Sequence, residues 1–119
     1  TIHANSPRDA LSRLETMVLM SGVELTIRAI REQIGSALDL LVQIARHRDG
    51  SRTISRVAEI TGLEGDIVTM QDLYSWHYER GRQDGRLGSI HPTGLRPTFS
   101  GELEDMGFGL DHSLFEGTA

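Results

Sequence analysis

The chain has 119 residues, of which 38% are apolar, and carries a formal net charge of −5 at pH 7. This length fits one domain with a modest core, and the acidic balance argues against a nucleic-acid binder that depends on bulk positive charge. The chain has no cysteine, which excludes disulfides, thiolate metal sites and thiol catalysis, and no apolar run approaches the roughly 20 residues that span a bilayer.

Lysine is absent, because all 12 residues in the lysine and arginine total are arginines. A Walker A loop needs a lysine that reaches the β- and γ-phosphates of a nucleotide, so the chain cannot contain a complete one. The chain opens on Thr1, and its first residues read as the middle of a structural element. We therefore expect a segment of a longer protein, without an internal repeat or domain boundary.

Two amphipathic helices are predicted first. Ser6 is a typical N-cap, Pro7 suits the first helical position, and Gly22 can end the helix. The apolar face of this helix comprises Ala10, Leu11, Leu14, Met17 and Val18. Thr26 can cap the second helix, and Gly35 weakens its C-terminal end by about 1 kcal/mol relative to alanine. The apolar residues of the second helix are Ile27, Ile30 and Ile34.

A change in the apolar period from about 3.6 to about 2 predicts a strand over residues 38–44, buried largely on one face. That face comprises Leu38, Leu40, Val42 and Ile44. A helix that continues through Leu41 also fits the pattern. The Asp49-Gly50 pair predicts a hairpin turn, after which residues 52–60 return as a second strand.

Turn residues at 62–66 lead into a third strand, predicted over residues 67–76. One side of this strand comprises Val68, Met70, Tyr74 and Trp76. Residues 79–88 are charged and rich in glycine, which predicts a loop in solvent, and residues 90–96 contain only short extended pieces.

A short helix is predicted near the C-terminus, with Ser100 as its cap, Leu103 and Met106 inside, and Gly107 at its end. The apolar tail residues are expected to tuck down onto the fold; they are Leu110, Leu114 and Phe115. The predicted order is two helices, an antiparallel meander of strands and a short helix.

The opening residues, TIHANSPRDALSRLETMVLMSG, resemble the His box and following helix of the ATPases that drive type II and type IV secretion machinery. Two further segments resemble one group of these proteins in particular, the CpaF-type ATPases of Tad/Flp pilus systems. These segments are RAIREQIGSALDLLVQIARHRDGSR and EGDIVTMQDL. The end of the chain is similar to that family's C-terminus in PTGLRPTF, LEDMG and a final LF. The resemblance covers nearly the whole chain, with departures at Thr26, at Gly35 and over residues 78–88.

The resemblance implies an α/β fold in which residues 1–119 form the C-terminal portion of a RecA-like P-loop NTPase domain. Members of this family are hexameric, ATP-hydrolysing motors on the cytoplasmic face of the inner membrane, where they act with pilus and secretion proteins. Their ATP and Mg²⁺ are held by the Walker A, Asp-box and Walker B motifs, which precede the His box. The chain alone is therefore expected to hold no cofactor and to hydrolyse no ATP.

Two site residues follow from the same resemblance. His3 matches the His-box histidine, the expected catalytic residue, and Asn5 belongs to the same motif near the nucleotide. Taken without the resemblance, a histidine at a strand end is more often an ordinary polar residue. Phosphoryl transfer depends mainly on positioning and electrostatics from a loop, a lysine and Mg²⁺ ligands, which one histidine cannot replace.

Basic residues gather around the predicted hairpin. They are Arg46, Arg48, Arg52 and Arg56. Such a group can contact an anion or a neighbouring subunit, as arginine fingers do in NTPases, or it can be the solvated tip of a hairpin. The remaining histidines lack the spacing of metal ligands, so no metal site is predicted and all are expected at the surface; they are His47, His77, His91 and His112.

A second function class stays open. The chain can instead be a non-enzymatic interaction or oligomerisation module that keeps the ring-packing surface of such a motor. A GxxxxGK[ST] motif upstream in the same reading frame favours the motor, whereas a start codon directly before this segment favours the module.

Overall fold

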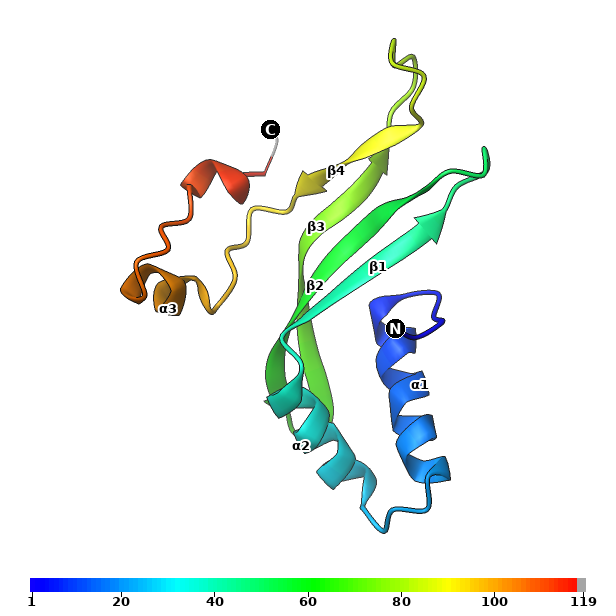
Figure 1. The fold of residues 1–119 in the computed structure, drawn as a ribbon, viewed down its shortest axis with the longest axis vertical. Coiled ribbons are helices and arrows are strands. Elements are labelled where there is room, and N and C mark those ends of the chain that lie inside the picture. Colours follow the sequence, from blue (N-terminus) through cyan, green and yellow to red (C-terminus); the bar gives the residue numbers. More distant parts are fainter. Residues whose placement is uncertain (118–119) are drawn as a thin grey trace.

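The computed structural model describes residues 1–117. Its elements follow one another as α1 (Pro7–Met20), α2 (Ile27–Ala37), β1 (Leu40–Arg46), β2 (Arg52–Glu64), β3 (Ile67–Tyr78), β4 (Gly88–Pro92), α3 (Ser100–Asp105) and the 3₁₀ turn η1 (His112–Leu114). The strands form one antiparallel sheet of four strands in the order β1-β2-β3-β4 (Figure 1). The fold is mixed α/β, and its elements follow the predicted order with β4 added.

Both N-terminal helices begin at the predicted caps. The hydroxyl of Ser6 accepts a hydrogen bond from the backbone N–H of Asp9 at 3.0 Å, and that of Thr26 accepts one from Ala29 at 3.1 Å. α2 stops short of Leu41, so the alternative of a helix through this residue is wrong. Within residues 1–117, no helix has the length and apolar character needed to cross a membrane.

The core lies between these two helices and one face of the sheet. Its buried residues are Leu11, Ile30, Ile34, Ile60 and Val68. Gly35 lets α2 approach β2 closely, because a Cβ at this position would lie 2.6 Å from Cδ1 of Leu63. The glycine that weakens the helix end therefore makes room for the packing of α2 on the sheet.

The predicted burial of β1 is wrong. Leu40, Val42 and Ile44 are 42%, 54% and 61% exposed. Leu41, on the opposite face, packs against the core and pairs with the fully buried Ala58 of β2. The period-2 alternation is correct, but the helices cover the face that carries Leu41. Alternation alone does not determine which of two apolar faces is covered.

The prediction that β3 presents one continuous apolar side is wrong. Val68 and Met70 pack in the core beneath the helices, whereas the ring of Tyr74 lies 6.3 Å from that of Phe115 in the C-terminal segment. The pairing of β3 with β2 skips Leu73. A bulge of this kind inserts one extra residue, so the side chains beyond it change face.

β2 and β3 are longer than predicted, the loop after β3 is shorter, and β1 begins and ends two residues later than the predicted range 38–44. The turn between β2 and β3 is confined to Gly65 and Asp66, where φ of Gly65 is 62°. At the other end of β3, Tyr78 pairs with Gly88. The predicted solvent loop over residues 79–88 is therefore the tip of a β3–β4 hairpin.

The segment after β4 lies on the opposite side of the sheet from α1 (Figure 1). Phe115 is buried, as predicted, whereas Leu114, which was expected to tuck down with it, is 49% exposed. Met106, predicted inside the last helix, is 70% exposed, and no residue of α3 is buried. The N-cap is Phe99 rather than Ser100, and it makes no side-chain cap. A helix this short presents little apolar surface: its one large apolar residue is Leu103, which is partly buried.

The described chain is more extended than a compact domain. Its radius of gyration is 16.9 Å, whereas a compact domain of this length would have about 13.5 Å. The exposed face of β1 and the two hairpin tips are therefore open surface in this structure.

Candidate functional site

An open hollow of about 570 Å³ lies between the N-terminal segment and β1. His3 lines it from the residues before α1, and Arg46 and Arg52 line it from the two strands at the turn end of the β1–β2 hairpin. All three side chains are exposed. The fold thus brings the predicted histidine together with two of the four predicted arginines.

Two hydrogen bonds position the N-terminal segment. Nε2 of Gln43 donates to the carbonyl oxygen of Ala4 at 2.9 Å. The backbone N–H of Asn5 donates to Oδ2 of Asp9 at 2.9 Å. This bond, followed by the one from Arg13, lowers the pKa of the Asp9 carboxyl. The bond from Asn5 is made by its backbone, and Gln43 is a positioning residue that the motif pattern did not reveal.

Arg46 and Arg52 are direct register partners across β1 and β2. Like charges at such a position repel one another. Among the residues that the structure describes, neither guanidinium forms an ion pair with a carboxylate. An anion between or beside them would relieve this repulsion.

The other two predicted arginines lie elsewhere. Nε of Arg56 is 3.6 Å from a carboxylate oxygen of Asp72. Arg48 lines a different hollow, together with Tyr78 and Glu79 of the next hairpin. The four arginines therefore do not form the single patch that their spacing suggested.

His47 is buried, so its predicted place at the surface is wrong. It is 6% exposed, and its Nε2 lies 2.5 Å from the hydroxyl of Thr53. Its ring centroid is 4.5 Å from that of Trp76, and its Nδ1 is 3.2 Å from the hydroxyl of Tyr78. Both ring nitrogens have partners within the fold, which is typical of a structural histidine.

A polar cluster joins the end of β3 to β4, and its members lie within residues 79–91. Oε1 of Glu79 is 2.8 Å from Nε2 of His91 and accepts a hydrogen bond from Ser89 at 3.0 Å. Arg82 forms an ion pair with the same carboxylate. These contacts, with that of His91 first, lower the pKa of Glu79. The register of the hairpin, rather than any motif, brings them together.

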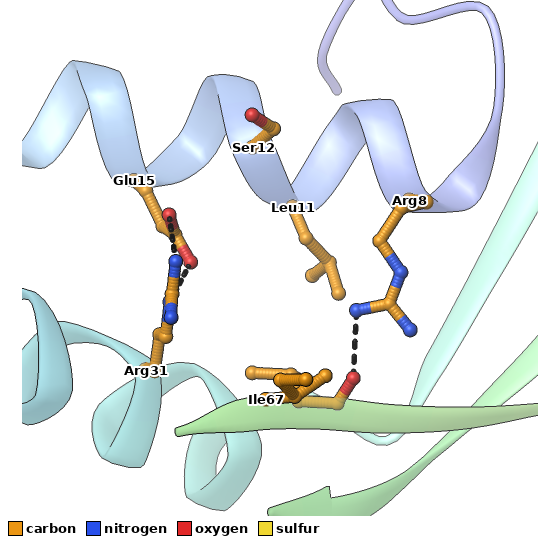
Figure 2. Close-up of a pocket in the computed structure, with 7 residues that line it drawn as sticks. Arg8, Leu11, Ser12, Glu15, Arg31 and Ile67 are labelled. Atoms are coloured by element: carbon orange, nitrogen blue, oxygen red, sulfur yellow. Dashed lines mark hydrogen bonds and ion pairs between the residues drawn. The ribbon is translucent and has the colours of Figure 1, made fainter.

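A smaller hollow, of about 280 Å³, lies between α1, α2 and the start of β3 (Figure 2). Its two arginines are already engaged: Nε of Arg31 is 2.7 Å from Glu15, and Nη1 of Arg8 donates to the carbonyl of Val68 at 2.7 Å. These contacts tie the helices to each other and to the sheet. The hollow is therefore a packing seam rather than a site with free charge.

The chemistry that the described residues offer is the neutralisation of negative charge. The hollow beside β1 holds two guanidinium groups and an imidazole. Across residues 1–117, no three histidine, aspartate or glutamate side chains are arranged to hold a metal ion.

Comparison with known proteins finds similarity to two proteins that are named for conjugal transfer. No family model matches the chain. Two proteins of Mycobacterium tuberculosis, from strains CDC 1551 and H37Rv, are 31% identical to it over 84 residues, and each bears the name "Putative conjugal transfer protein". The matched region is 71% of this chain and 22% of each relative, so the chain spans about a fifth of the length of these curated relatives.

Proposed function

We propose that the chain is the His-box and C-terminal part of a CpaF-type, ATP-hydrolysing motor for conjugal transfer, secretion or pilus assembly. The observation that carries this proposal is the similarity over 84 residues to the conjugal transfer relatives. The family motifs in TIHANS, RHRDGSR and EGDIVTMQDL support the finer assignment to a secretion ATPase. Residues 1–119 would then be the C-terminal portion of a RecA-like domain.

The hollow beside β1 supports a role for His3 near phosphate groups. Phosphoryl transfer builds negative charge in the transition state, and preorganised donors lower its energy. His3, Arg46 and Arg52 line one hollow and could supply such donors. ATP and Mg²⁺ would be held by motifs outside this chain, which has no lysine.

The proposed assembly is a hexameric ring on the cytoplasmic face of the inner membrane, with membrane proteins of the transfer or pilus machinery as partners. Support comes from the exposed apolar side chains of Val42, Ile44 and Ile54, which a ring subunit or the remainder of the motor would cover.

The test uses the longest protein whose reading frame contains this segment. We expect a GxxxxGK[ST] motif upstream and ATPase activity that the P-loop Lys→Ala variant abolishes. A frame without the motif, or a purified protein without lysine-dependent turnover, would remove the motor proposal.

The second candidate is an interaction module without enzymatic activity. The specific observation that favours it is that β1 forms an edge of the sheet and has an exposed apolar face. A short reading frame that begins just before Thr1 and yields a stable, inactive protein would favour the module.

A further inference from the structure

One peptide group next to His3 is held from two sides. Its carbonyl oxygen, that of Ala4, accepts a hydrogen bond from Nε2 of Gln43 in β1 at 2.9 Å. Its N–H, that of Asn5, donates to Oδ2 of Asp9 in α1 at 2.9 Å. Because a peptide unit is planar, bonds at both ends fix its orientation as well as its place. β1 and α1 together therefore position the backbone that carries His3 (Figure 1).

The β1 side of this arrangement requires an amide. Gln43 lies two positions after Leu41, on the face of β1 that the helices cover, and it is partly buried. Its Nε2 has two carbonyl acceptors, Ala4 at 2.9 Å and Ile44 at 3.4 Å. An amide NH₂ group has a donor for each of them, whereas a carboxylate of the same size has none. A polar side chain on a core-facing strand position is costly unless it is bonded in this way.

The backbone of Gln43 is itself held by β2. The pairing of β1 with β2 has a bulge directly after the Gln43–Arg56 pair, where it skips Ser55. The hydroxyl of Ser55 donates to the carbonyl oxygen of Gln43 at 3.3 Å. Bulges bend a strand and change the direction of nearby side chains. The residue that reaches the His3 segment is thus fixed to the hairpin at an irregular point of the sheet.

The same hairpin carries the two arginines of the hollow. Arg46 follows Gln43 by three residues in β1, and Arg52 is the register partner of Arg46. Both line the hollow with His3. Donors that stabilise developing charge must be held in place before the reaction, and a displacement of about 1 Å can cost on the order of 10²-fold in rate. Gln43 connects the strand that carries the arginines to the segment that carries the histidine.

We infer that Gln43 is a positioning residue for ATP hydrolysis: its amide holds His3 in place relative to Arg46 and Arg52. The inference rests on the proposed function, because it requires that the longer protein hydrolyses ATP. Gln43 touches no reacting atom in this role and acts through the peptide group next to His3. Loss of its donor should therefore slow the reaction only while His3 is present.

The test is a double-mutant cycle in the longest protein whose reading frame contains this segment, with kcat and KM for ATP measured for each variant. Gln43→Leu removes the donor, and Gln43→Glu keeps the size but sets a carboxylate against the carbonyl oxygens. Each should lower kcat by about ten- to a hundredfold and change KM by less than about threefold. In the His3→Ala background, Gln43→Leu should change kcat by less than about twofold.

The matched control is Gln33→Leu, the same substitution at an exposed glutamine of α2, which should leave kcat within about twofold of wild type. Thermal unfolding establishes that each variant is folded. Hydrogen exchange followed by mass spectrometry should show faster exchange in residues 3–9 of Gln43→Leu and Gln43→Glu, and unchanged exchange there in Gln33→Leu.

Two kinetic results overturn the inference and leave the proposed function in place. One is an equal proportional loss of kcat from Gln43→Leu with and without His3, which indicates a general structural effect. The other is wild-type kcat in both Gln43 variants while the P-loop Lys→Ala variant is inactive. A protein without lysine-dependent turnover would instead remove the proposed function, and this inference with it.

Discussion

The buried carboxylate of Glu59 accepts a hydrogen bond from the backbone N–H of Thr98 at 2.9 Å, which joins β2 to the segment between β4 and α3. The hydroxyl of Thr98 donates to the same carboxylate, and Nε2 of Gln71 donates to its other oxygen at 2.7 Å. Glu59 is 1% exposed. A buried carboxylate with this many donors serves as an anchor for the C-terminal segment.

Glu59→Gln should destabilise the fold by about 1–3 kcal/mol, because the new amide group would place a donor against donors that now face a carboxylate. Thermal or urea unfolding measures the loss, and hydrogen exchange should show faster exchange first in residues 95–115. Glu64→Gln, at an exposed glutamate of the same strand, should stay within about 0.5 kcal/mol of wild type. Equal effects of both variants would show that the anchor contributes nothing specific.

The chain alone should neither hydrolyse ATP nor bind it tightly, since it has no lysine and no phosphate-cradling glycine loop. Calorimetric titration and a phosphate-release assay are the measurements. Turnover that persists through a second, independent purification, and that therefore does not come from a contaminating ATPase, would contradict this prediction.

In the intact longer protein, His3→Ala should lower ATP turnover substantially and change nucleotide affinity by no more than a few-fold. The reason is that a donor near the phosphates acts more on transition-state charge than on ground-state binding. Steady-state kinetics with a nucleotide-binding titration separates the two. Wild-type turnover in the variant would leave His3 with only a structural role.

Acid should loosen the β3–β4 hairpin through Glu79. The hydrogen bond with His91, followed by those from Arg82 and Ser89, holds the pKa of this carboxyl below its ordinary value of 4.5. A carboxyl with a lowered pKa in the fold stabilises the folded state above its unfolded-state pKa, and this stabilisation is lost as the pH falls through the folded-state value.

Glu79→Gln isolates that contribution, because the other carboxylates of the chain titrate in both proteins. The melting temperature of wild type should exceed that of the variant near neutral pH, and the difference should shrink as the pH falls below about 4.5. A difference that is constant between about pH 7 and pH 3 would show that the variant acts through packing alone.

The apolar face of β1 and β2 should make the chain associate as its concentration rises. Ile44 and Ile54 are register partners and are 61% and 44% exposed. Ile44→Ser/Ile54→Ser should reduce the association with little loss of stability, whereas Ile30→Ala, in the core, should cost about 2–5 kcal/mol. Analytical ultracentrifugation with thermal unfolding measures both. A wild-type chain that stays monomeric and unfolds cooperatively across a hundredfold concentration range would favour the self-sufficient interaction module.

Local signals in the sequence predicted the helices and the first hairpin well. The caps at Ser6 and Thr26 and the turn at Asp49-Gly50 depend on residues within a few positions of one another. The alternation predicted over residues 38–44 is correct from Leu40 on, where β1 begins. Which face the helices cover is decided by the packing of α2 on β2, and both faces of β1 carry apolar residues, so the sequence alone did not determine it.

Features that depend on the register between strands could not be predicted from the sequence. The bulge at Leu73 moves Tyr74 to the face opposite Met70, and no local residue pattern marks it. The joining of Arg46 and Arg52 with His3, and the separation of Arg48, follow from how the hairpin meets the N-terminal segment. Spacing along the chain predicted that the four arginines lie near one hairpin, but it could not predict which of them line the same hollow.

The bulge at Leu73 affects how the protein unfolds locally. Because the side chains of β3 change face at this point, Val68 and Met70 pack with the helices, whereas Tyr74 packs with the C-terminal segment on the other face of the sheet. Local unfolding proceeds in such contiguous units, and the less buried unit opens first. The C-terminal segment can therefore detach and rejoin as a foldon while the helix layer stays intact, and each opening would bare Glu59 and Tyr74 together.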